Sequence, residues 1–81
     1  MKYIATFYSH FGAVRFKKIC EQYKYSAKLM PVPRDLSSSC GTCVSFESDS
    51  LKMDDVLSEE LEQIACISSD GYEVLFRAAD S

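Results

Sequence analysis

The sequence predicts one small α+β domain over residues 1–81, with its elements in the order βαββαβ. Three observations support this prediction. Short segments alternate apolar and polar residues, which is typical of half-buried strands. Two other segments repeat apolar residues at spacings of three and four, the pattern of a helix that buries one face. The chain has 81 residues, 47% of them hydrophobic, so it has room for one domain with a modest core.

The first strand and the first helix are predicted at the N-terminus. Residues 2–8 alternate and are rich in Tyr, Ile, Thr and Phe, which favours a strand that ends at Ser9. Ser9 is then a suitable N-cap for a helix from Phe11 to Tyr23. The residues expected on the buried face of this helix are Ala13, Phe16, Cys20 and Tyr23.

Two strands follow the helix. The second strand covers residues 26–32, and its prolines confine it to an edge of the sheet because proline cannot donate a ladder hydrogen bond. The third covers residues 43–48, with Val44 and Phe46 on the same face. A polar loop that contains a serine triplet separates these two strands.

A second helix and a last strand complete the predicted order. The acids Asp54 and Asp55 suit a helix N-terminus, and a turn at Ser68–Gly71 leads into a strand at residues 72–77. Within that strand, Tyr72, Val74 and Phe76 are expected to share a face. The apolar positions of the second helix are Val56, Leu57, Leu61 and Ile64. This order most often folds as a ferredoxin-like two-layer sandwich, an antiparallel four-stranded sheet with two helices on one face.

The charge is unevenly distributed along the chain. Residues 1–34 carry seven Lys and Arg against one acid, and residues 35–81 carry two against eleven, for a net charge of −3. The acidic half opposes phosphates, so we expect no nucleic-acid partner. No apolar run reaches membrane-spanning length and no secretory signal precedes the first strand. We therefore expect a cytoplasmic protein without a membrane partner.

The motif Cys40-Gly-Thr-Cys43 is the candidate functional site. In the reducing cytosol, cysteines are more often free thiols, metal ligands or redox groups than disulfides. A CxxC pair is a redox pair, half of a metal site, or a nucleophile with a resolving thiol. A zinc site with four ligands would need two more beside the CxxC pair, and the remaining candidates are Cys20, Cys66 and His10. Cys20 lies on the apolar face of the helix, which argues against such a site within one chain. We expect no metal and no cofactor.

The predicted topology brings three loops to one edge of the sandwich: residues 9–12, 33–42 and 68–71. Cys66 should approach the same edge. The first helix presents its N-terminus there, and its partial positive charge favours a thiolate. His10 and Arg34 would lower the pKa of a loop cysteine further if they approach it.

The stretch Pro31-Val-Pro-Arg34, followed by Ser37-Ser-Ser-Cys-Gly41, resembles the putative selenium/sulfur carrier-like proteins over nearly the whole chain. The resemblance implies that Cys40 holds a sulfur or selenium atom as a persulfide or selenosulfide. It would receive this atom from a donor protein and pass it to an acceptor protein. A resolving role for Cys43 rests on spacing alone. Ser39 and Gly41 flank Cys40 and are expected, with His10 and Arg34, to support the thiolate.

Two alternatives remain open beside this stoichiometric, non-enzymatic carrier. The same CxxC loop suits a redox-sensing or metal-binding interaction module, and the fold suits a purely structural binding domain. The first strand also predicts a homodimer through the open sheet face. The side chains of this first strand alternate between the two faces, with Tyr3, Ala5 and Phe7 on one face and Ile4, Thr6 and Tyr8 on the other.

Overall fold

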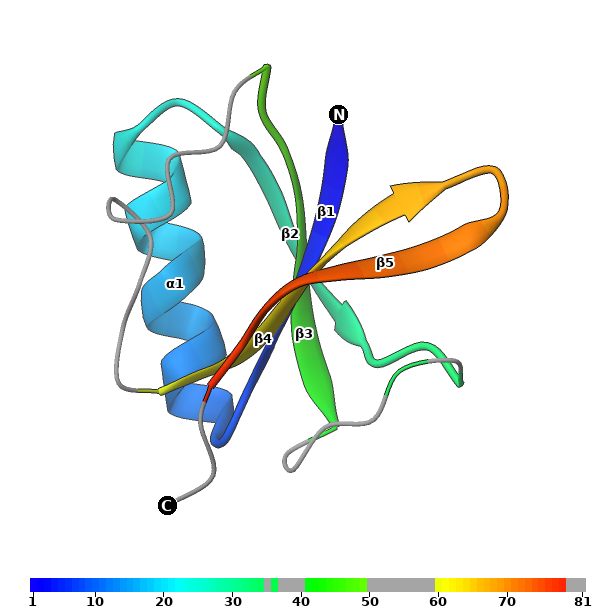
Figure 1. The fold of residues 1–81 in the computed structure, drawn as a ribbon. Helices are drawn as coiled ribbons and strands as arrows, with labels where there is room; N and C mark the ends of the chain where they lie inside the picture. Colours follow the sequence, from blue (N-terminus) through cyan, green and yellow to red (C-terminus); the bar gives the residue numbers. More distant parts are fainter. Residues whose placement is uncertain (35, 37–40, 50–59, 79–81) are drawn as a thin grey trace.

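One helix and five strands make up the part of the chain that the computed structural model describes, residues 1–34, 36, 41–49 and 60–78 (Figure 1). In chain order they are β1 (Lys2–Phe7), α1 (His10–Gln22), β2 (Ser26–Pro31), β3 (Thr42–Glu47), β4 (Leu61–Ser68) and β5 (Gly71–Arg77). The strands form one antiparallel sheet in the order β2-β3-β1-β4-β5. Helix α1 packs on one face of this sheet (Figure 1).

Phe46 on β3 is the centre of the core between α1 and the sheet. Its ring centroid lies 5.3 Å from that of Tyr3 on β1 and 5.3 Å from that of Phe16 on α1. Tyr25, just before β2, stacks on it at 6.3 Å. Aromatic pairs at these distances add to the free energy gained by burying their area. This cluster therefore ties the helix to β1, to β3 and to the residue that precedes β2.

Several sequence-based expectations are confirmed. The first helix and the first, second, third and last strands lie within two residues of their predicted bounds, and β2 is an edge strand. Ser9 is the N-cap of α1, and its hydroxyl accepts a hydrogen bond from Gly12 N at 3.1 Å. Tyr23 is an exception, because it is the C-cap residue and is 47% exposed rather than buried.

The predicted ferredoxin-like sandwich is wrong. The described residues contain a five-stranded sheet and one helix, where four strands and two helices were expected. The segment Leu61–Ser68, which includes the end of the predicted second helix, is the strand β4. The start of that predicted helix, with Asp54, Asp55, Val56 and Leu57, lies outside the described residues.

A β-bulge explains why β4 resembles a helix in sequence. Phe7 of β1 pairs with Leu61, but the preceding Thr6 pairs with Gln63, so Glu62 is an extra residue in β4. The bulge places Leu61 and Ile64 on the same face although they are three positions apart. Spacing of three is also the helical pattern, and the periodicity cannot distinguish the two.

A second irregularity changes the faces of β5. Ile64 pairs with Phe76, whereas Ala65 pairs with Val74, so Leu75 is the extra residue. Phe76 therefore packs against the core under α1, while Val74 lies on the other face of the sheet. The expectation that Val74 and Phe76 share a face is wrong for this reason. In Figure 1 the β4–β5 hairpin crosses the other strands at a steep angle, as expected because bulges increase strand twist.

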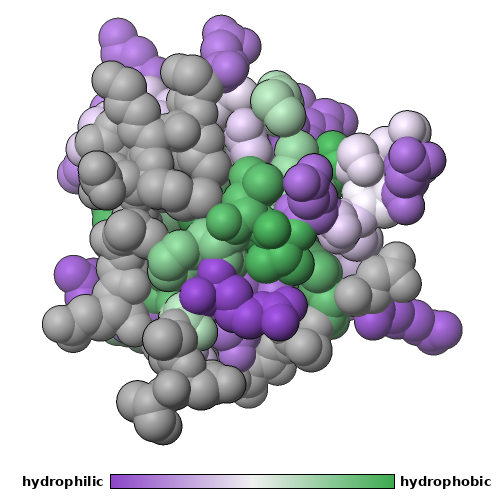
Figure 2. Space-filling model, viewed as in Figure 1, coloured by the Kyte–Doolittle hydropathy of each residue, from purple (hydrophilic) through white to green (hydrophobic). Residues whose placement is uncertain are grey.

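The face of the sheet opposite α1 is also buried at its centre. The side chains there are at most 5% exposed, and they are Ile4, Thr6, Cys43, Gln63 and Ala65. Figure 2 shows apolar residues gathered at the middle of the view, where β5 crosses the sheet in Figure 1, between strongly hydrophilic ones. A second copy of the chain is not needed to cover these residues, and the homodimer stays a prediction.

The central place of Phe46 gives a stability prediction. We expect Phe46→Ala to lower the free energy of unfolding by about 3–5 kcal/mol, because it removes a ring that three others contact and leaves a cavity. Urea denaturation measures this change. The matched control is Phe11→Ala, since Phe11 is 65% exposed and its loss should cost less than about 1 kcal/mol. Equal costs for the two variants would contradict the proposed core.

Candidate functional site at the start of α1 and β3

Of the three loops predicted to meet at one edge of the sheet, the ones at residues 9–12 and 33–42 begin at the same edge. Thr6 near the end of β1 pairs with Cys43 near the start of β3, and Pro31 at the end of β2 pairs with Thr42. The β1–α1 junction and the β2–β3 connection therefore lie at the same edge of the sheet. The Ser68–Gly71 turn does not, because β4 runs antiparallel to β1.

Cys66 also lies away from this edge. It pairs with Tyr3 near the start of β1, at the opposite end of the strand from Thr6. The expectation that Cys66 and the Ser68–Gly71 turn approach the candidate site is wrong. It assumed a second helix that enters β5, whereas β4 and β5 form a hairpin.

His10 contacts Thr42, a residue of the cysteine motif and the first residue of β3. Its Nδ1 atom lies 3.4 Å from Oγ1 of Thr42, and which atom donates the hydrogen bond depends on the histidine tautomer. His10 is the first residue of α1, so this contact brings the N-terminus of the helix to the start of β3. The predicted approach of the helix N-terminus to this loop is confirmed at Thr42.

Gly41 has a backbone conformation that explains its residue type. Its φ is +75°, a region that residues with a Cβ rarely adopt, and nothing lies within 4 Å of where a Cβ would be. The glycine is therefore required for its backbone freedom rather than for space. Its carbonyl accepts a hydrogen bond from Val32 N at 3.2 Å, which closes the base of the β2–β3 connection.

Arg34 lies in the same connection but is not joined to His10. It follows Pro33, whose carbonyl accepts a hydrogen bond from Leu36 N at 3.0 Å, so Arg34 occupies a tight turn. Its side chain is exposed and makes no ion pair with any described residue.

Cys43 is buried on the face opposite α1. Adjacent strand residues point to opposite faces, so Thr42 reaches toward His10 while Cys43 points away. The thiol is 0% exposed, and its Sγ donates to the carbonyl oxygen of Pro31 at 3.6 Å. In this conformation the Cys43 sulfur is not accessible to a partner protein. Ser39 and Cys40 lie outside the described residues.

The remaining two thiols are part of the core beneath α1. Cys20 and Cys66 belong to the same buried cluster, and neither forms a disulfide. Burial, and to a smaller extent the neighbouring charge of Glu21, raises the pKa of Cys20 to about 12. Cys20 is therefore a packing residue and a poor nucleophile. In the described part of the chain, no three His, Cys, Asp or Glu side chains gather in a way that could hold a metal ion.

Glu60 is a site neighbour that sequence reasoning missed. Its carboxylate oxygen Oε1 accepts from Arg15 at 3.0 Å, and its carbonyl accepts from Tyr8 N at 3.0 Å. The second oxygen, Oε2, is buried beside Gly12 in the first turn of α1 and has no hydrogen-bond partner among the described residues. A carboxylate is stabilised near a helix N-terminus. Only the pairing of β4 with β1 places it there, so no local sequence pattern marks it.

The family model described as "Putative Se/S carrier protein-like" matches residues 2–67 of the chain. The protein belongs to this family. The match spans β1 to β4 and includes the whole β2–β3 connection, but it ends before β5. No curated protein and no solved structure matches the sequence. Among the described residues, no helix has the length and apolar character needed to cross a membrane.

Close packing between Gly12 and Glu60 gives a second prediction. A Cβ at position 12 would lie 2.6 Å from the Glu60 Cβ, so Gly12→Ala must displace the start of α1 from Glu60, the residue before β4. We expect this variant to be destabilised by about 1–3 kcal/mol, although alanine is normally the better helix former by about 1 kcal/mol.

The double variant Gly12→Ala/Glu60→Gly is the matched test, because it removes the atom that the new methyl group meets. It should be more stable than the sum of the two single changes predicts, by about 1 kcal/mol or more in urea denaturation. Additive effects would show that the contact does not limit the approach of the helix.

The raised pKa of Cys20 predicts a pH dependence of stability. The thiol stays protonated in the folded protein up to about pH 12, whereas its ordinary pKa is 9.0. The contribution of the Cys20 thiol to the unfolding free energy is complete below the pKa that this thiol has in the unfolded chain. It is lost as pH rises from about 9 toward 12. Cys20→Ala should show a shallower fall in unfolding free energy over this range than the unchanged protein. Cys66→Ala serves as the control, and an equal slope in all three proteins would contradict the prediction.

Proposed function

We propose that this protein carries a sulfur or selenium atom on Cys40, as a persulfide or selenosulfide, and relays it between a donor and an acceptor protein in the cytoplasm. The family to which the chain belongs supports the class of function. The choice of Cys40 rests on its sequence block and on the position of the other three thiols.

A carrier thiol must be reached first by a donor and then by an acceptor. Cys20 and Cys43 are 0% exposed and Cys66 is 7% exposed, so none of the described thiols meets this requirement. Cys40 is the remaining cysteine of the four. The burial of the three described thiols is the observation that carries the proposal.

His10 is proposed to support the Cys40 thiolate. Its contact with Thr42 holds an imidazole two residues along the chain from Cys40. His10 is also the first residue of α1, so the partial positive charge of the helix N-terminus lies beside the imidazole. Both features favour a negative sulfur, and the thiolate rather than the thiol is the nucleophile.

The residues around Cys40 have proposed roles of their own. Gly41 supplies the backbone turn that ends the loop and begins β3. Ser39 is proposed to donate its hydroxyl to the carried anion. Arg34, which has no ion-pair partner among the described residues, would attract the negatively charged donor or acceptor group.

Cys43 is proposed to control the lifetime of the persulfide. Its thiolate would attack the Cys40 sulfur, form a Cys40–Cys43 disulfide and expel the terminal sulfur as hydrosulfide. The thiol is buried against Pro31, so this attack requires the first residues of β3 to separate from β2. Burial of Cys43 therefore slows loss of the carried atom.

Mass spectrometry tests the proposal directly. The protein, reduced and then incubated with a cysteine desulfurase and L-cysteine, should gain one sulfur atom, and Cys40→Ser should not. Cys43→Ser should gain the same atom and keep it longer, because the route to the disulfide is removed. A selenium donor should give the corresponding selenium adduct if the carrier accepts both elements.

Cys66→Ser is the control for a buried thiol and should gain sulfur as the unchanged protein does. Native alkylation with iodoacetamide should modify Cys40 well before the three buried cysteines. The proposal fails if no donor produces an adduct, or if the adduct persists in Cys40→Ser.

A further inference from the structure

A row of side chains crosses the sheet on the face opposite α1. Cys43 of β3 pairs with Thr6 of β1, Thr6 pairs with Gln63 of β4, and Gln63 pairs with Arg77 of β5. Directly paired residues on one face have Cβ atoms about 5 Å apart. The row becomes more polar toward β5 and ends in the positive charge of Arg77.

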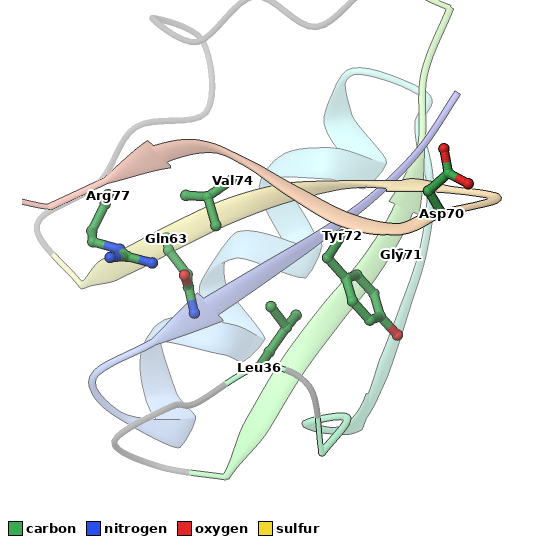
Figure 3. A pocket seen from close by; sticks show the side chains of 7 residues that line it. All are labelled: Leu36, Gln63, Asp70, Gly71, Tyr72, Val74 and Arg77. Atoms are coloured by element: carbon green, nitrogen blue, oxygen red, sulfur yellow. The ribbon is translucent and has the colours of Figure 1, made fainter.

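A pocket of about 360 Å³ opens at the β5 end of this row. It lies within the size range of small-molecule sites, about 300–1,000 Å³, at the lower end. Figure 3 shows Arg77 and Gln63 near one another at one end of the hairpin, Tyr72 toward the other end, and Leu36, from the β2–β3 connection, between them. The lining residues are Leu36, Gln63, Asp70, Gly71, Tyr72, Val74 and Arg77.

The charge of Arg77 is not neutralised by another described residue. No ion pair joins Arg77 to a described carboxylate. Glu62, its neighbour across the bulge, accepts a hydrogen bond from the Thr6 hydroxyl at 3.2 Å. Asp70 lines the far end of the pocket, and Figure 3 shows it at the tip of the hairpin. The strand length between Gln63 and Ser68 separates these two ends by about 16 Å.

The pocket therefore has a positive end at Arg77, and Gln63 and Tyr72 add polar side chains to its lining. A guanidinium beside an amide matches the donor pattern that binds carboxylates and other oxyanions. Leu36 and Val74 supply apolar surface next to it.

We propose that this pocket binds a small organic molecule that carries a carboxylate or another oxyanion. Its anionic group contacts the Arg77 guanidinium at the end of the pocket that Gln63 also lines, and its apolar part lies against Leu36 and Val74. This site is separate from the proposed carrier chemistry, and most of its lining comes from residues beyond the matched range 2–67. The family match therefore does not account for this pocket.

Titration of the full ¹⁵N-labelled chain with benzoate tests the site, with benzamide as the neutral ligand of nearly the same shape. Benzoate should shift the amide resonances of Gly71 and Tyr72 and the side-chain amide of Gln63, and benzamide should bind at least tenfold more weakly. The variant Arg77→Gln should lose at least tenfold in benzoate affinity, the loss expected for one charged hydrogen-bonding group.

Arg34→Gln is the matched control, because it removes the same charge from an exposed arginine that does not line the pocket. It should leave benzoate affinity unchanged, and Arg77→Lys should keep most of it. The inference is overturned if benzoate shifts none of the three resonances at millimolar concentration, if benzamide binds equally well, or if Arg34→Gln weakens binding as much as Arg77→Gln. The sulfur-transfer assay on Cys40 reads out independently of all these results.

Discussion

Strand β1 pairs with β3 on one side and with β4 on the other, and five of its six residues are buried. Tyr3, Ala5 and Phe7 pack beneath α1, while Ile4 and Thr6 are buried on the opposite face. Every other element is positioned relative to this strand. Its end carries Ser9 into α1, and its registers bring the start of β3 and the start of β4 to the same edge. The proposed carrier site depends on that alignment.

The two irregularities in β4 and β5 shape the face of the sheet that carries the proposed pocket. The extra residue Glu62 turns its carboxylate to the Thr6 hydroxyl, and the extra residue Leu75 moves Phe76 into the core. Arg77 then lies on the opposite face beside Gln63. A regular hairpin would have kept Val74 and Phe76 on one face, and the polar pocket would not have formed in this way.

The β2–β3 connection joins the two proposed sites. Leu36 lines the pocket, and Cys40 follows four residues later in the same segment. Gly41 closes this segment through its hydrogen bond with Val32, and Thr42 ties it to His10. Of the two thiols of the motif, the described one, Cys43, belongs to the sheet, and its sulfur contacts Pro31.

The sequence by itself determined the local elements and the family. Alternation located β1, β2, β3 and β5, the Ser9 cap and helical spacing located α1, and the block around Cys40 pointed to the carrier family that the family match supports. Only the tertiary structure decided that Leu61–Ser68 is a strand, because a bulge reproduces helical spacing. It also decided which residues meet: His10 with Thr42, Glu60 with the first turn of α1, and Arg77 with Gln63. These contacts join residues far apart in the chain through strand register, which local sequence patterns do not encode.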